Sequence, residues 1–143
     1  MLVGYPAERM LALVNDIASY PEFLPWCAGA DVIHESDNTL RATLKIGYKG
    51  IRQQFSTRNH TTEPDKNAPA SIKMSLVDGP FRSLNGQWLF KPLDDEACKV
   101  EFTLRYEFSS KLLEKVIGPA FNYIANSFVD AFVRRANSLY GNR

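Results

Sequence analysis

The sequence has few cysteines, little net charge and no long apolar segment. Cys27 and Cys98 are its two cysteines and lack C-x-x-C spacing, so we expect reduced thiols in a cytoplasmic protein rather than a disulfide. The formal net charge of +1 gives no bulk attraction to nucleic acid or to a membrane, and no DNA partner is predicted. No apolar run reaches the roughly 18 residues of a membrane span. Met1 to Gly4 lead directly to Pro6, which does not fit a signal peptide.

Motifs for catalysis and metal binding are also lacking. His34 and His60 stand alone in the sequence, and no nucleophile elbow, zinc-protease helix or phosphate-binding loop is found. Ligands for a metal ion do not cluster. We therefore expect a protein that is not an enzyme, with no catalytic residue, no metal and no required cofactor.

Alternation of apolar and polar residues predicts that β-strands dominate the chain from Ala28 to about residue 108. A short helix is predicted before them, over residues 6–15, because Pro6 suits a first helical turn. Strict alternation gives a sheet one dry face and one wet face, so we predict an antiparallel meander with a polar turn at 63–69. Turn residues separate the alternating segments, which are 40–48, 51–60, 72–76, 84–90 and 99–108.

A change of period near residue 109 predicts a long C-terminal helix. Ser109 and Ser110 offer an N-cap, and Gly118-Pro119 is expected to interrupt the helix by a kink or by a restart. Because one apolar helix must be buried against a sheet with one dry face, and long strands twist, the sheet should curl around the helix. The apolar stripe of this helix contains Phe121, Ile124, Ala125, Phe128, Val129, Phe132, Val133, Ala136 and Leu139.

The predicted architecture is an α+β helix-grip fold, in which a curved antiparallel sheet wraps around a long C-terminal helix. One helix cannot fill the concave side of a many-stranded curled sheet. Either bulky side chains occupy the remaining space or a cavity is left for a ligand, and the supply of Phe and Trp is compatible with both.

Four stretches of the sequence resemble one known family: LVNDIASYPEFLPWC, FSTRN, SLVDGPFRSLNGQWLF and FTLRYEFSSKL. In this order they are similar to the coenzyme Q-binding START-domain family, once grouped with polyketide cyclases, and the likeness extends from about Val3 to Tyr140. The resemblance implies a START/Bet v-like helix-grip fold and a single START-like domain over residues 1–143. Relatives usually begin with a full alternating strand, whereas only residues 1–4 precede Tyr5-Pro6 here, so we expect a truncated N-terminal strand.

The resemblance also implies functions. Members of the family are viewed as binders of ubiquinone or similar polyisoprenoid lipids, which predicts a carrier of a hydrophobic ligand that supports respiration. One branch is described as toxins that bind the large ribosomal subunit and block its association with the small one, and this is the alternative. A polyketide cyclase-like enzyme is a third reading, for which only His34 or Asn59 offers an inward acid–base group.

An aromatic wall is predicted for the ligand site. Gly86, within a predicted strand, indicates close backbone approach or a bend. A quinone ring prefers offset stacking on aromatic side chains, but plain core packing explains the same residues. We assign the wall to Trp26, Phe81, Trp88, Phe90, Phe121, Ile124 and Phe128.

A few polar groups are predicted to share the interior with this wall. If Ile51 and Phe55 point inward, Gln53, Thr57 and Asn59 lie on the same face, where they can hydrogen-bond quinone carbonyls or trapped water. Ligand pockets typically combine apolar walls with a few such groups. The alternative is that Thr57 and Asn59 lie near a wet strand end.

The segment YPEFLPWC, residues 20–27, carries unusually many apolar side chains for a segment with two prolines. Beside the mouth of a cavity it would act as a lid, with Phe23, Leu24 and Trp26 facing a ligand, and its prolines lower the cost of ordering it. The alternative is a hydrophobic clamp that anchors the first helix to the sheet.

The wet face of the hairpin at 38–62 carries basic residues and no acidic ones. By alternation Arg41, Lys45, Arg52 and Arg58 share this face, which is typical of an RNA-phosphate contact. A solvated sheet face is the plainer interpretation, since Lys and Arg also discourage edge pairing. Transient contact with anionic lipid headgroups at a membrane surface is a further alternative.

Overall fold

The computed structural model describes residues 1–63 and 69–141, so most of the polar turn predicted at 63–69 lies outside the described residues. The predicted strands and both predicted helices are confirmed within these ranges. The elements are β1 (Leu2–Val3), α1 (Ala7–Asn15), the 3-10 helix η1 (Ile17–Glu22), β2 (Cys27–Ser36), β3 (Thr39–Tyr48), β4 (Ile51–Thr62), β5 (Ala70–Asp78), β6 (Phe81–Pro92), β7 (Cys98–Phe108) and α2 (Lys111–Tyr140).

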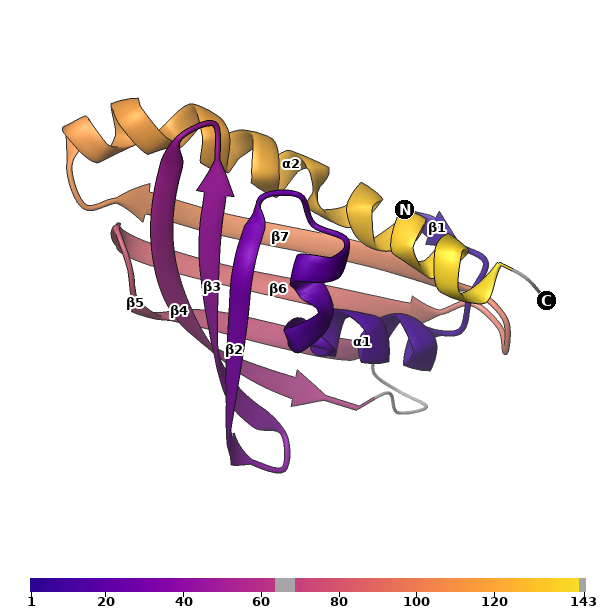
Figure 1. The fold of residues 1–143 in the computed structure, drawn as a ribbon. Coiled ribbons are helices and arrows are strands. Elements are labelled where there is room, and N and C mark those ends of the chain that lie inside the picture. Colours follow the sequence, from indigo (N-terminus) through magenta and orange to yellow (C-terminus); the bar gives the residue numbers. More distant parts are fainter. Residues whose placement is uncertain (64–68, 142–143) are drawn as a thin grey trace.

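The described strands form one seven-stranded antiparallel sheet in the order β1-β7-β6-β5-β4-β3-β2. From β2 to β7 each strand pairs with the next one along the chain, which confirms the predicted meander. Figure 1 shows the curl of the sheet: β2, β3 and β4 cross the direction of β5, β6 and β7, and α2 runs along the sheet. The α+β helix-grip fold is therefore confirmed.

The β3–β4 turn fixes the register of the hairpin. Lys49 and Gly50 have positive φ values of 48° and 80°, the combination that a two-residue type I′ turn requires. Pairing then places Phe55 opposite Leu44. Alternation from this pair turns the apolar residues of both strands toward α2.

α2 begins at a side-chain cap and runs through a proline. The hydroxyl of Ser110 accepts a hydrogen bond from the main-chain N–H three residues on, at 3.1 Å, which confirms the predicted N-cap. Gly118-Pro119 lies inside the helix and does not restart it. Ile117 and Phe121 are buried on either side, and this packing compensates for the hydrogen bond that a proline cannot donate.

An aromatic cluster joins α2 to the concave face of the sheet. The ring of Trp88 on β6 lies 4.5 Å from that of Phe102 on β7 and 5.4 Å from that of Phe132 on α2, between centroids. Trp88 and Phe132 are each 1% exposed. Burial of such a side chain contributes about 1.5–3 kcal/mol. The interior is therefore closely packed around Phe132.

The N-terminal segment pairs with the edge of the sheet. Leu2 and Val3 lie opposite Lys99 and Cys98 on β7. The amino group of Met1 donates a hydrogen bond to the carbonyl of Val100 at 2.8 Å. None of the described helices is both long enough and apolar enough to cross a membrane.

Candidate functional site

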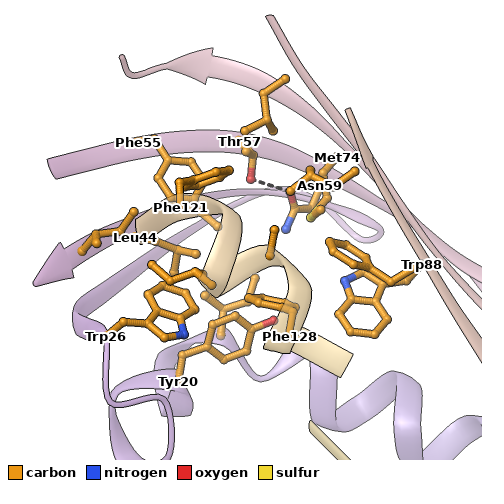
Figure 2. A pocket seen from close by; sticks show the side chains of 18 residues that line it. Tyr20, Trp26, Leu44, Phe55, Thr57, Asn59, Met74, Trp88, Phe121 and Phe128 are labelled. Atoms are coloured by element: carbon orange, nitrogen blue, oxygen red, sulfur yellow. Dashed lines mark hydrogen bonds between the residues drawn. The ribbon is translucent and has the colours of Figure 1, made fainter. Parts of the chain in front are cut away.

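A cavity of about 60 Å³ lies between the concave face of the sheet and α2. Alternation turns every second residue of each strand toward the helix, so the walls come from β3 to β7, from α2 and from the η1 region. Figure 2 shows how these side chains surround the space. The lining contains Ile17, Tyr20, Trp26, Ala42, Leu44, Ile46, Phe55, Thr57, Asn59, Met74, Leu84, Trp88, Phe102, Leu104, Phe121, Ile124, Ala125 and Phe128.

The size of the cavity decides between the two interiors that the sequence leaves open. An engineered cavity of about 150 Å³ holds one benzene molecule, whereas this cavity has about 60 Å³. Aromatic side chains therefore fill most of the interior, and a small apolar cavity remains.

Thr57 and Asn59 bring polar groups into this apolar lining. Both are 5% exposed, and the hydroxyl of Thr57 donates to Oδ1 of Asn59 at 2.7 Å. The amide nitrogen of Asn59 points into the cavity (Figure 2). The hydroxyl of Thr57 occupies the acceptor oxygen of Asn59, so the amide nitrogen is the polar group that Asn59 presents to the cavity.

The structure brings eight of the predicted ligand-site residues together around the cavity. Thr57 and Asn59 are buried and do not lie at a wet strand end. The eight are Trp26, Phe55, Thr57, Asn59, Trp88, Phe121, Ile124 and Phe128.

Two predicted residues of β6 point inward but lie beyond the ends of the cavity. The ring of Phe81 packs 5.1 Å from that of Phe108 and 5.0 Å from that of Phe121, where β6 begins. The ring of Phe90 stacks 5.9 Å from that of Trp88 and is fully buried near the other end of the strand. These two side chains are core residues.

Phe23 and Gln53 also lie outside the cavity lining. The centroid of the Phe23 ring lies 5.2 Å from that of Phe132, on the outer side of α2. The guanidinium carbon of Arg135 lies over the Phe23 ring, 5.0 Å from its centroid. Gln53 lies opposite Ile46 near the β3–β4 turn and borders a hollow at the surface. The structure therefore does not bring these two predicted residues into the cavity lining.

Some lining residues escaped the sequence analysis. Leu44, Ile46, Met74, Leu84, Phe102 and Leu104 occupy inward positions of the alternating pattern, which was the signal that could have identified them. Ile17 and Tyr20 are placed by η1, and alternation does not predict a 3-10 helix. The hydroxyl of Tyr20 donates to the carbonyl of Val14, and burial raises the pKa of this phenol far above its ordinary value.

The segment 20–27 is packed against the molecule rather than open above it. Tyr20, Leu24 and Trp26 are at most 5% exposed. The N–H of Gly47 donates to the carbonyl of Trp26 at 2.8 Å, and that of Leu24 donates to Tyr20 at 2.9 Å. This arrangement corresponds to the hydrophobic clamp, the alternative to a lid for this segment. Trp26 and Tyr20 also line the cavity.

A groove of about 380 Å³ follows the outer side of α2 next to this segment. Trp26 lines the groove as well as the cavity, so the two spaces adjoin this residue. The cationic side chains in the groove are Arg134 and Arg135. The remaining lining is Phe23, Leu24, Pro25, Tyr48, Tyr123, Ser127, Ala131 and Ser138.

The basic residues predicted on the outer face of the hairpin lie on β3 and β4. Arg41 and Arg58 are opposite each other across the two strands, and Lys45, Arg52 and Arg58 are exposed. Glu35 on β2 pairs with Arg58 at 2.7 Å. The hydrogen bond from Arg58 holds the pKa of Glu35 below its ordinary value, so part of this basic charge is neutralised.

A second basic area continues across the outer face of the sheet. A surface hollow of about 620 Å³ is lined there by Arg58, His60, Lys73 and Arg105, with Asn85 and Gln87 among its polar groups. No carboxylate belongs to its lining as far as the structure describes it. This hollow was not predicted, because its residues come from five different strands.

Neither the cavity nor the cysteines show a catalytic arrangement in the described residues. The cavity lining contains no carboxylate, imidazole or thiol, and His34 is exposed on β2. Cys27 and Cys98 are free and buried, and burial raises the pKa of both thiols. Residues 1–63 and 69–141 hold no group of three or more His, Cys, Asp or Glu side chains suited to a metal ion.

Relatives of this chain carry names of two kinds. The ribosome association toxin RatA of Vibrio cholerae is 48% identical over 140 residues, which are 98% of this chain and 94% of that protein. RatA of Pseudomonas aeruginosa is 43% identical with the same coverage. The mitochondrial coenzyme Q-binding protein COQ10 of Drosophila melanogaster is 29% identical over 144 residues, 98% of this chain and 57% of that protein.

A solved structure shares the fold. The Zhui aromatase/cyclase from Streptomyces sp. R1128 superposes with a TM-score of 0.73 at 17% identity, over 95% of this chain and 89% of that one. Residues 3–133 match the family model described as polyketide cyclase / dehydrase and lipid transport. With its START-like helix-grip fold, the chain belongs to this family.

Proposed function

We propose that this chain is a RatA-type protein that binds the large ribosomal subunit in the cytoplasm and blocks association with the small one. The observation that carries the proposal is the identity of 43–48% to relatives named for ribosome association, over nearly the whole chain. The outer face of the sheet is the surface that suits an RNA partner.

The hollow on this face supplies the physical argument. Arg58, His60, Lys73 and Arg105 line it, and the described lining contains no carboxylate, although Glu35 pairs with Arg58 from outside the hollow. Arginine and lysine neutralise RNA phosphates, and such contacts make binding strongly dependent on salt. Arg41, Lys45 and Arg52 extend the same charge along β3 and β4.

Sucrose-gradient ribosome profiles test this function. Wild type should reduce the fraction of joined ribosomes, whereas Arg41→Glu/Arg52→Glu and Lys73→Glu/Arg105→Glu should not. Lys111→Glu/Lys115→Glu makes the same change of charge on α2 and serves as the matched control. Equal profiles for all these proteins would remove the proposed role of this face.

A second function, binding of a ubiquinone-like hydrophobic ligand, is favoured by the cavity. Its apolar walls contain the amide nitrogen of Asn59 and the indole N–H of Trp88, which are hydrogen-bond donors. Quinone carbonyls accept hydrogen bonds and the ring stacks on aromatic side chains. Because the cavity has about 60 Å³, lining side chains have to move when a ring enters.

Native mass spectrometry of protein purified from its own host tests ligand binding directly. A co-purifying lipid or quinone is expected, together with a change in Trp fluorescence on addition of decylubiquinone. Absence of both would count against this function while leaving ribosome binding intact, since the two use opposite faces of the sheet.

Catalysis is not part of the proposal. The described cavity lining offers no acid–base pair, and His34 lies outside it. If a cyclase-like turnover were detected, its loss in His34→Ala protein would overturn this view.

A further inference from the structure

The cavity and the outer groove share one wall, the side chain of Trp26. The cavity has about 60 Å³ and the groove about 380 Å³. On the cavity side the Trp26 ring lies 5.9 Å from that of Phe128, between centroids. A change in the position of this one ring therefore alters both spaces.

The main chain around Trp26 is held by hydrogen bonds, and its ring is buried and packs against that of Phe128. The carbonyl of Trp26 accepts a hydrogen bond from the N–H of Gly47 at 2.8 Å, and the next N–H, that of Cys27, donates to Leu24 at 3.0 Å. Because these hydrogen bonds are made by the main chain, rotation of the Trp26 side chain would leave them intact.

The groove is cationic on the side of α2. Arg135 makes one loose ion pair, 4.0 Å from its NH2 group to Oε1 of Glu22, whose side chain is 63% exposed. Its Nε is buried and has no hydrogen-bond partner in the described protein. A buried N–H without an acceptor is costly, more so on a charged group. An anionic oxygen bound in the groove would supply that acceptor.

We propose that the cavity and the groove are two compartments of one ligand site, joined by rotation of the Trp26 side chain. In this site the groove binds the phosphate or carboxylate head of a single-chain lipid through Arg135 and Arg134. The apolar chain of the lipid passes Trp26 and enters the cavity, whose lining side chains have to move to admit it because the space has about 60 Å³. The proposal rests on the ligand-binding function and narrows its ligand to an anionic amphiphile.

The charge of the head group is tested with two lipids of equal chain length. Native mass spectrometry and titration should show oleoyl lysophosphatidate binding about tenfold or more tightly than oleoyl lysophosphatidylcholine, as for a hydrogen bond to a charged group. Arg135→Gln should abolish this preference and Arg135→Lys should keep part of it. Arg82→Gln, an exposed change on β6, is the matched control and should keep all of it.

Rotation of the wall is tested in Trp88→Phe protein, in which Trp26 is the remaining tryptophan. Lysophosphatidate should shift its emission and raise its quenching by acrylamide. Native mass spectrometry of the same Trp88→Phe protein shows independently whether lipid binds to it. Binding with unchanged Trp26 emission would overturn the rotation.

Different results would overturn the anionic groove and the ligand-binding function on which it rests. Equal affinity for both lipids, or a preference that survives Arg135→Gln, overturns the anionic groove while decylubiquinone still binds. If neither lipid nor decylubiquinone binds, the ligand-binding function is overturned together with the inference.

Discussion

Thr57 donates its hydroxyl hydrogen to Oδ1 of Asn59 across 2.7 Å, two residues along the same strand. Both side chains face the concave side of the sheet, where the rest of the described cavity lining is apolar apart from Tyr20 and the indole nitrogens. The pair satisfies the acceptor of Asn59 and leaves its amide hydrogens to the cavity. A buried polar pair of this kind couples stability to ligand recognition.

Asn59→Leu should destabilise the protein by about 1–3 kcal/mol, because the hydroxyl of Thr57 then lacks an acceptor. The double variant Thr57→Val/Asn59→Leu should lose less stability than the single Asn59→Leu variant, since both partners are replaced by apolar groups of similar shape. Urea unfolding of wild type, Thr57→Val, Asn59→Leu and the double variant gives the coupling free energy of the two side chains. Additive losses would contradict the hydrogen bond as the source.

Phe128 and Phe132 offer a matched pair on α2, because Phe128 lines the cavity and Phe132 does not. Leucine at either position should cost about 1–3 kcal/mol in the free energy of unfolding. Only Phe128→Leu enlarges the ligand cavity, so it alone should bind decylubiquinone more tightly than wild type in a Trp fluorescence titration. Equal affinities of the two variants for decylubiquinone would show that binding does not depend on the volume of this cavity.

Glu35→Gln should strengthen ribosome binding, because it frees Arg58 from its ion pair on the outer face. The salt dependence of binding should become steeper by about one counterion. Ribosome co-sedimentation at several salt concentrations measures both. An unchanged slope would show that Arg58 does not contact RNA.

The same pair predicts a pH dependence. Because Arg58 lowers the pKa of Glu35 below 4.5, their pairing contributes stability above this ordinary value and loses it as the pH falls through the lowered pKa. The small difference in Tm between wild type and Glu35→Gln should therefore disappear in acid. A difference that persists there would indicate another cause.

Alternation predicts which face of the sheet a residue joins, because the period of a strand fixes the direction of its side chains. Thr57, Asn59 and Trp88 were located in this way. Phe81 and Phe90 obey the same rule but miss the cavity. Their distance along β6 from Phe128 depends on where α2 crosses the strands, and the pattern of a strand carries no information on that.

Contacts between distant segments are harder still to predict. Glu35 and Arg58 belong to β2 and β4, which are separated by β3, so their ion pair depends on the registers of two hairpins. Phe23 lies outside the cavity because η1 directs it toward Arg135. Neither relationship leaves a periodic signal in the sequence.

Gly86 gives a way to reduce the cavity without removing any group that lines it. A Cβ at this position would lie 2.4 Å from the terminal methyl of Met74 and 3.1 Å from Cδ1 of Leu104, two side chains of the lining. The sequence analysis indicated close approach here, and the structure identifies what approaches. Because the methionine side chain is flexible, Gly86→Ala should displace it into the cavity with little loss of stability.

Gly86→Ala should therefore bind decylubiquinone more weakly than wild type, although its urea midpoint changes little. Gly47→Ala is the control within the same sheet, since its Cβ would meet only Ala28, at 3.4 Å, away from the cavity. Weaker binding by Gly86→Ala and unchanged binding by Gly47→Ala would follow from steric narrowing of the cavity. Unchanged binding by a well-folded Gly86→Ala protein would mean that the ligand lies elsewhere.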